Sequence, residues 1–109
     1  MILKNILPQN IDWSSISEEK ISGETGYVII KIKKFGNIQI RKIEYSQNYK
    51  ADHWCDKGHI VYVLHGELII EYKEHSSHII KSGMSYVVGD KSLSHKAVSM
   101  NGATVLIID

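Results

Sequence analysis

The 109-residue sequence lacks a pair of cysteines that could form a disulfide, and it lacks long hydrophobic runs. Its single cysteine rules out an intramolecular disulfide, so the chain does not need an oxidising compartment. No window approaches the length of apolar residues that spans a bilayer. The first residues lack the basic start and long apolar run of a signal peptide. We therefore expect a soluble, cytoplasmic protein with no membrane partner.

An excess of charge of either sign is also absent. The formal net charge is +1, and the lysines are spread along the chain. Nucleic-acid binding requires a basic stripe, and the one short basic patch, residues 31–34, is better explained as a solvated strand face. We expect no nucleic-acid partner.

Short strand-like segments fill the chain from Tyr27 onward. β-branched runs alternate with turn residues such as Gly36, Asn37 and Gly83, at the spacing typical of an all-β sandwich or barrel. No helix of several turns is predicted. The predicted strands are residues 27–34, 38–46, 59–72, 78–81, 84–88, 95–99 and 104–108.

Residues 1–26 are predicted to form an irregular lead-in, and residues 27–109 a single β-domain. Asp12 or Ser14 could cap a short helical turn through residues 17–20, with a loop over residues 22–26. Several isoleucines and Trp13 make the lead-in too apolar for a disordered tail. We expect it to pack on the β-domain or on a partner subunit.

Two predicted strands, residues 60–64 and 105–108, are apolar on both faces. A sheet with one solvated face should alternate apolar and polar residues, so a second surface is expected to cover these strands. A homodimer is the corresponding prediction. Alternation also slips between Ile40 and Ile43, which predicts a bulge at residues 41–42, and Gly66 predicts a bend or bulge within its strand.

The stretch from Asp52 to Gly66 holds two histidines and the only cysteine within seven residues. Residues two apart on a strand share a face, so His53 and Cys55 are expected to point together, and His59 could lie opposite them on the next strand. His95 opens a later strand. Three imidazoles and a thiolate would suit Zn²⁺, Fe²⁺, Ni²⁺ or copper. The alternative is that the histidines are hydrogen-bonded pocket residues and Cys55 a small buried apolar residue.

The spacing in this stretch resembles the first motif of the cupin family, which is His-x-His, three or four residues, Glu, six residues and Gly. Here His53-x-Cys55 is followed by three residues, His59, six residues and Gly66. A four-residue spacing would instead select Asp52 and Trp54, and Trp54 has no ligating atom. The second cupin motif is matched loosely, with Gly83 in place and His95 one residue late.

Within the cupins, the chain is most similar to the cupin-fold proteins that are named for a DHCW motif. The shared residues are 51–55 (Ala-Asp-His-Trp-Cys), 57–59 (Lys-Gly-His), 83–86 (Gly-Met-Ser-Tyr) and His95. This resemblance implies an all-β, cupin-like double-stranded β-helix, or jelly-roll barrel, with an irregular N-terminal segment. It also implies a divalent transition metal, Zn, Fe or Ni, bound by His53, Cys55, His59 and His95.

The cupin glutamate is replaced by His59, so the carboxylate of many cupin metal sites is missing and dioxygenase chemistry does not transfer. The implied function is a small cupin that binds a metal and a small-molecule ligand in its barrel and that could act as a metalloenzyme. The alternative is a cupin that binds or senses a ligand without catalysis. No catalytic residue is assigned. We expect Arg41 to be a surface charge; the alternative is that Arg41 and Tyr45 line the pocket and hold an anion. Tyr86 is expected to pack in the core, with pocket lining as its alternative.

Overall fold

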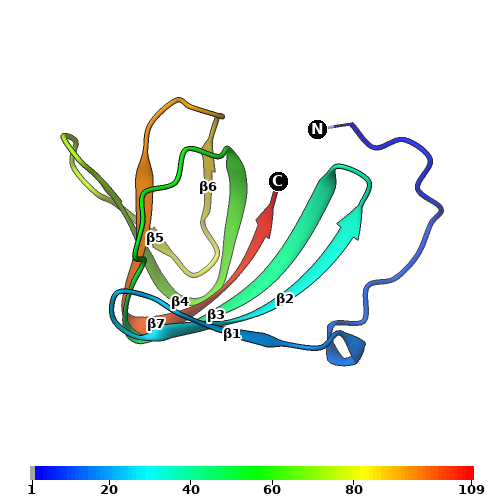
Figure 1. Ribbon diagram of the computed structural model, residues 1–109, viewed down its shortest axis with the longest axis horizontal. Helices are drawn as coiled ribbons and strands as arrows, with labels where there is room; N and C mark the ends of the chain where they lie inside the picture. The colour runs from blue at the N-terminus through cyan, green and yellow to red at the C-terminus, as the bar shows by residue number, and fades with distance from the viewer. Residues whose placement is uncertain (1) are drawn as a thin grey trace.

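β-strands account for nearly all the regular structure of residues 2–109, the part of the chain that this computed structural model describes (Figure 1). The all-β prediction is confirmed. No helix within this part of the chain is long and apolar enough to cross a membrane. The elements are η1 (Trp13–Ser15), β1 (Glu19–Ser22), β2 (Tyr27–Phe35), β3 (Ile38–Lys50), β4 (His59–Tyr72), β5 (His78–Lys81), β6 (Ser85–Val88) and β7 (His95–Ile108).

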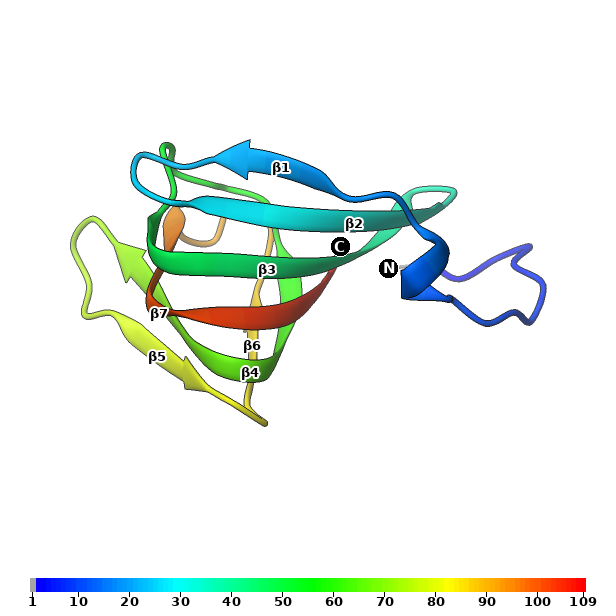
Figure 2. The ribbon, with the colours of Figure 1, turned by 90° about the horizontal axis from the view of Figure 1, so that it is seen from below.

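The strands form one antiparallel sheet in the order β1-β2-β3-β7-β4-β5, with β6 also paired to β4 (Figure 2). The long strand β4 pairs along one edge with β7. Its other edge pairs first with β6 and then with β5. The sheet is strongly curved (Figure 1), and residues of β2, β3, β4 and β7 line a trough on its inner face.

The core lies on the concave face of this curved sheet. Its members come from β2, β3, β4, β5 and β7, and Val63 and Val105 are fully buried. Alternation along the strands sends their neighbours to the outer face. Other core residues are Val28, Ile43, Val61, Leu68, Ile70 and Ile107.

Two glycines bend the long strands where they cross. Gly66 has φ +76°, and the register between β4 and β7 shifts after Gly66, which confirms the predicted bulge. Gly102, with φ +92°, bends β7 without ending it. The predicted turn at residues 101–102 is therefore wrong: residues 95–108 form one strand, because a glycine with positive φ can change the direction of a strand while the pairing continues.

The outer face explains a second difference from the sequence prediction. The register of β3 with both β2 and β7 is unbroken across residues 40–45, so no bulge lies at residues 41–42. Ile43 is in the core and Ile40 faces outward, where it pairs with Ile108. Alternation was lost because the outer face is apolar here, not because the strand is irregular. β3 also continues to Lys50, past its predicted end at residue 46.

The N-terminal segment is more regular than expected near its end. Asp12 caps the turn η1, as predicted, with its side chain accepting from the Ser14 amide, but the turn occupies residues 13–15 and not 17–20. Glu19–Ser22 is strand β1, paired to β2, and local patterning did not reveal this long-range partner. Leu3 and Leu7 are exposed (70% and 79%), and Figure 1 shows the first residues running away from the barrel. Their packing on a partner stays a prediction.

Candidate metal centre

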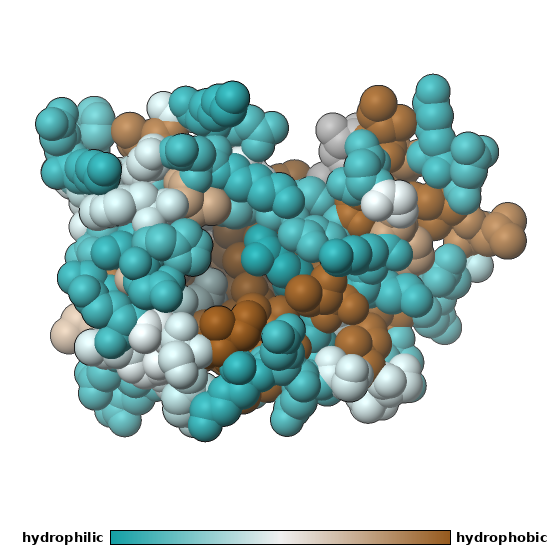
Figure 3. Space-filling view, in the orientation of Figure 1, coloured by the Kyte–Doolittle hydropathy of each residue, from teal (hydrophilic) through white to brown (hydrophobic). Residues whose placement is uncertain are grey.

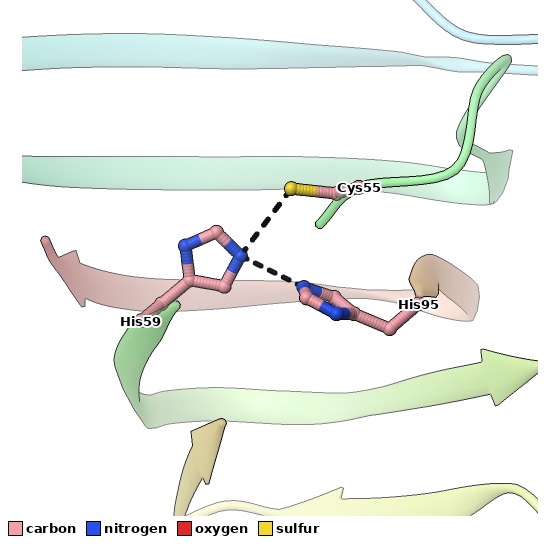
Figure 4. Close-up of side chains that lie close together, drawn as sticks. All are labelled: Cys55, His59 and His95. Atoms are coloured by element: carbon pink, nitrogen blue, oxygen red, sulfur yellow. Dashed lines mark hydrogen bonds between the residues drawn. The ribbon is translucent and has the colours of Figure 1, made fainter. Parts of the chain in front are cut away.

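Three potential metal ligands meet at one end of the trough: Cys55, His59 and His95 (Figure 4). Their donor atoms all lie within 4.8 Å of one another. The Nε2 atom of His59 is 2.9 Å from Nε2 of His95 and 3.7 Å from Sγ of Cys55. His95 is buried, and the other two are partly buried. These are three of the four ligands predicted from the sequence, and the structure brings their donor atoms together.

Backbone pairing sets the positions of these side chains. Cys55 and His95 form an isolated antiparallel bridge, in which the Cys55 amide donates to the His95 carbonyl (2.8 Å) and the His95 amide donates back (3.0 Å). His59 is the first residue of β4. The turn before it is held by the Gly58 amide, which donates to Oδ1 of Asp90 (2.7 Å). One loop bridge and two strand ends thus place Cys55 and His59, which are close in sequence, beside His95, which lies 36 positions after His59.

Each histidine uses its Nδ1 atom for a hydrogen bond to an oxygen. Nδ1 of His59 lies 3.0 Å from a carboxylate oxygen of Asp109, and Nδ1 of His95 lies 2.9 Å from the backbone carbonyl oxygen of Leu93. A carbonyl and an ionised carboxylate can only accept, so both Nδ1 atoms must carry the hydrogen. In the neutral rings, both Nε2 atoms then present lone pairs to each other at 2.9 Å.

Two facing lone pairs at this distance require a positive species between them, either a proton or a metal ion. A proton is disfavoured on His59, because burial lowers its pKa more than the neighbouring Asp109 raises it. A tetrahedral metal with bonds of about 2.0–2.1 Å to nitrogen would hold two nitrogens about 3.3 Å apart. The observed separation is within a few tenths of an ångström of that value, so the donor set fits a metal ion.

A carboxylate does lie beside the candidate metal centre, that of Asp109. It contacts Nδ1 of His59 and is not one of the three potential ligands. The Asp109 side chain is 1% exposed and pairs with the Arg41 guanidinium at 2.7 Å as well as with His59. Burial alone would raise the pKa of Asp109, but hydrogen bonds from His59 and Gln39 and the charges of Arg41 and Lys57 lower it below its ordinary value. No motif signalled this residue, since its contact with His59 spans fifty positions.

His53 stands apart from the trio. Its side chain is 77% exposed, and Nδ1 lies 2.6 Å from Oδ1 of the adjacent Asp52. The expectation that His53 and Cys55 point the same way assumed a strand. Residues 51–58 instead form a loop in which Cys55 alone makes a bridge to another strand, so the rule of two-residue alternation does not apply.

A cavity of about 290 Å³ lies beside the trio, within the trough. Its walls are mostly aliphatic residues of the core, with Tyr45, Tyr49 and Tyr86 adding hydroxyl groups and Arg41 adding a charge that Asp109 largely balances. Figure 3 shows apolar side chains deep in the hollow between the two halves of the sheet and hydrophilic residues around its rim. Arg41 lines the cavity and is not the surface charge that was expected, whereas Tyr86 both packs against the core and lines the cavity. The cavity therefore lies next to a cluster of sulfur and nitrogen donors from Cys55, His59 and His95.

Comparison with known proteins gives structural likeness but no sequence family. No family model matches the chain. No curated protein matches it either. Among solved structures, an RmlC-like cupin from Shewanella frigidimarina is 16% identical, with a TM-score of 0.76 over 94% of this chain and 89% of the other.

Two structures from Thermotoga maritima are also similar. A protein described as a predicted oxalate decarboxylase is 14% identical, with a TM-score of 0.74 over 92% of this chain and 96% of its own. A cupin-like protein is 19% identical, with a TM-score of 0.71 over 83% and 74% of the two chains. At these identities the likeness shows the fold alone. The predicted fold class is confirmed: the chain is a cupin-like jelly-roll barrel.

Proposed function

We propose that this protein is a metal-binding cupin in which Cys55, His59 and His95 hold one divalent transition metal at the edge of the cavity. The observation that supports this most directly is the pair of histidines whose Nδ1 hydrogens are both committed to oxygens, so that two Nε2 lone pairs converge. Oxygen partners behind ligating histidines are typical of metal sites, where they set the tautomer and the ring orientation.

The donor set restricts the metal. One thiolate and two imidazoles suit zinc, iron(II) or nickel better than the hard cations calcium or magnesium. Three protein ligands leave at least one coordination position open, as in catalytic zinc sites. A bound metal would supply Lewis-acid chemistry at that position.

The cavity provides the place for a small molecule that would use this open position. Its aliphatic walls can bury the apolar part of a ligand, while the three tyrosine hydroxyls and Arg41 can orient its polar groups. Its volume of about 290 Å³ suits a small metabolite rather than a polymer. The second candidate function is a non-catalytic sensor that binds such a molecule. It is favoured by the shortage of free carboxylates at the cavity: Asp52, the one carboxylate among the described cavity-lining residues, is paired with His53.

Elemental analysis of protein purified without a histidine tag tests the metal proposal. After reconstitution with Zn²⁺, Fe²⁺ or Ni²⁺, we expect about one equivalent of metal per chain. His59→Ala and His95→Ala should lose most of it. His65→Ala is the matched control, because His65 is exposed on the same strand as His59. Less than about a tenth of an equivalent in the wild type would overturn the proposal.

The variant His53→Ala decides between the two ligand sets. The three-residue site predicts that it binds metal as the wild type does. Loss of metal from His53→Ala would mean that the loop at residues 51–58 folds inward and that the four-residue set predicted from the sequence is the correct one.

Turnover separates the enzyme from the sensor. The metal-loaded protein would be screened with small thiols, diketones and sugars, and oxygen consumption and substrate loss would be measured. Turnover that disappears in His95→Ala supports the metalloenzyme. A ligand that raises the melting temperature of the loaded protein without being consumed supports the sensor.

Three further expectations stay proposals. The closer assignment to the DHCW-motif cupins is supported by residues 51–55, 57–59 and 83–86. A cytoplasmic location is supported by the free thiol of Cys55. A homodimer is supported by the apolar outer face of the sheet, which is treated with its test in the Discussion.

A further inference from the structure

A second cluster of hydrogen-bonding side chains, Tyr72, Tyr86 and His78, connects the cavity to the surface. The hydroxyl oxygen of Tyr72 on β4 lies 2.5 Å from the hydroxyl oxygen of Tyr86 on β6. The same Tyr72 oxygen lies 2.8 Å from Nδ1 of His78, the first residue of β5. The three rings are in contact, with the Tyr72 and His78 centroids 5.4 Å apart in an edge-to-face arrangement.

The two ends of this chain of hydrogen bonds lie in different surroundings. His78 is exposed to solvent, while Tyr72 is buried (8% exposed). Tyr86 lines the same cavity as Cys55, His59 and His95. The ring centroid of Tyr86 is 6.5 Å from that of His95. The buried hydroxyl of Tyr72 thus joins a group that exchanges protons with water to a group that faces the ligand chamber.

The protonation of His78 determines which way the hydrogens in this chain point. When both ring nitrogens carry hydrogen, Nδ1 donates to Tyr72, Tyr72 donates to Tyr86, and the hydrogen of Tyr86 is free for the cavity. When Nδ1 carries none, it accepts from Tyr72, which accepts from Tyr86, and the cavity meets only lone pairs of the Tyr86 oxygen.

We propose that His78, Tyr72 and Tyr86 form a proton path from solvent to the cavity and that Tyr86 is the group that protonates the bound ligand. This inference rests on the proposed function, since it needs a ligand in the cavity. In the forward step the O–H bond of Tyr86 breaks and its proton passes to a basic oxygen of the ligand. The Tyr72 proton moves to Tyr86, and the Nδ1 proton of His78 moves to Tyr72. The result is a protonated ligand and a neutral His78, which regains a proton from water.

The surroundings of Tyr86 agree with a transfer role. Burial raises its pKa, and the hydrogen bond with Tyr72 raises it further. Tyr86 therefore stays protonated in the resting protein and acts by passing a proton on. The titratable groups that face His78 are Tyr72 from β4 and Tyr86 from β6; His75, in the turn between β4 and β5, contacts the far side of the Tyr72 ring.

The connection can be tested by nuclear magnetic resonance on metal-free protein labelled at tyrosine Cζ and histidine Cε1. During a pH titration, the Cζ signals of Tyr72 and Tyr86 should move with that of His78, with midpoints that agree within about 0.2 pH units, because coupled groups titrate together. In Tyr72→Phe, which keeps the ring and removes the hydroxyl, the part of the Tyr86 response that shares the midpoint of His78 should disappear.

Two controls make the result decisive. Tyr62→Phe removes an exposed hydroxyl on the same strand and should leave the coupled titration unchanged. His78→Gln, at an exposed position, should abolish the response of Tyr86 even if Tyr72→Phe does not fold. A Tyr86 signal that ignores His78, or that still follows it in Tyr72→Phe, overturns the proton path. Because the titration uses metal-free protein, failure to bind metal would overturn the proposed function and leave this result standing.

Discussion

At the scale of single residues, the oxygen atoms bonded to Nδ1 of His59 and His95 set the geometry of the candidate metal site. Asp109 holds Nδ1 of His59 and is itself held ionised by Arg41, whose terminal nitrogen is 2.7 Å from its carboxylate. A negative charge at Nδ1 makes the opposite nitrogen a stronger donor to a metal. The orientation of His59 therefore depends on a residue at the far end of the chain.

The variant Asp109→Asn should weaken metal binding by about 10–100-fold, the usual effect of losing such a partner. A competition titration with a chromophoric chelator would measure the change. Asp52→Asn is the matched control, since that carboxylate pairs with the exposed His53 and its loss should leave the affinity unchanged. Equal affinities of the wild type and Asp109→Asn would contradict this role.

Acid should destabilise the metal-free protein through His59. Burial lowers the pKa of His59 in the folded state, so between that value and the ordinary value of about 6.5 the unfolded chain binds more protons. The free energy of unfolding is then highest above about pH 6.5 and falls as the pH is lowered, by about 1.4 kcal/mol for each unit of pKa difference. Urea denaturation at several pH values would show this slope, and His59→Gln should flatten it. A slope unchanged in His59→Gln, or flattened equally by His65→Gln, would assign it to other groups.

At the scale of strands, the barrel depends on the bends that Gly66 and Gly102 allow. A Cβ on Gly66 would lie 2.3 Å from the carbonyl oxygen of Gly102 and 2.9 Å from Cα of Ala103, in a backbone with φ +76°. Both contacts are with main chain of β7, which cannot move without breaking the pairing of β4 and β7. The crossing of these strands therefore tolerates no side chain at this position.

Gly66→Ala should lower the free energy of unfolding by several kcal/mol, the sum of left-handed strain of about 1–2 kcal/mol and overpacking of about 1–3 kcal/mol. Gly83→Ala is the control: Gly83 also has positive φ, at +86°, but nothing lies within 4 Å of an added Cβ. It should show the strain alone. Urea denaturation of both variants would measure the difference, and equal losses would mean that the contact with Gly102 does not matter.

At the scale of the whole molecule, the outer face of the sheet carries a row of aliphatic side chains across four strands. Register pairs Val87 with Ile60, Ile60 with Ile108, and Ile108 with Ile40. Val87 is 73% exposed and Ile60 43%, and Tyr62 beside them is 41% exposed. An exposed apolar surface of this kind is typical of a protein interface. The strands that are apolar on both faces predict that a second copy of the chain covers this surface.

The homodimer prediction is tested by sedimentation equilibrium of the wild type and Val87→Asp. An unpaired charge in an apolar interface costs several kcal/mol, so Val87→Asp should weaken dimerisation by about 100-fold or more. Met100→Asp is the control, since Met100 is 61% exposed and lies outside the row. A wild type that sediments as a monomer at all concentrations would show the prediction to be wrong.

Local patterns in the sequence were sufficient for much of this fold. The all-β class, most strand positions, the bend at Gly66 and the cap at Asp12 follow from residue types and their spacing. They depend on forces that act between neighbours in the chain, such as strand alternation and the conformational freedom of glycine. The cluster of Cys55 and His59 was visible for the same reason, because four positions separate them.

Only the tertiary structure decided which candidate ligands lie together. His53 lies away from Cys55, His59 and His95 because residues 51–58 form a loop in which Cys55 alone bridges to another strand. The Asp109 contact with His59 and the path from His78 to Tyr86 join residues on different strands. Contacts of this kind arise from strand order and register across the sheet, which the spacing of residues along the chain does not encode.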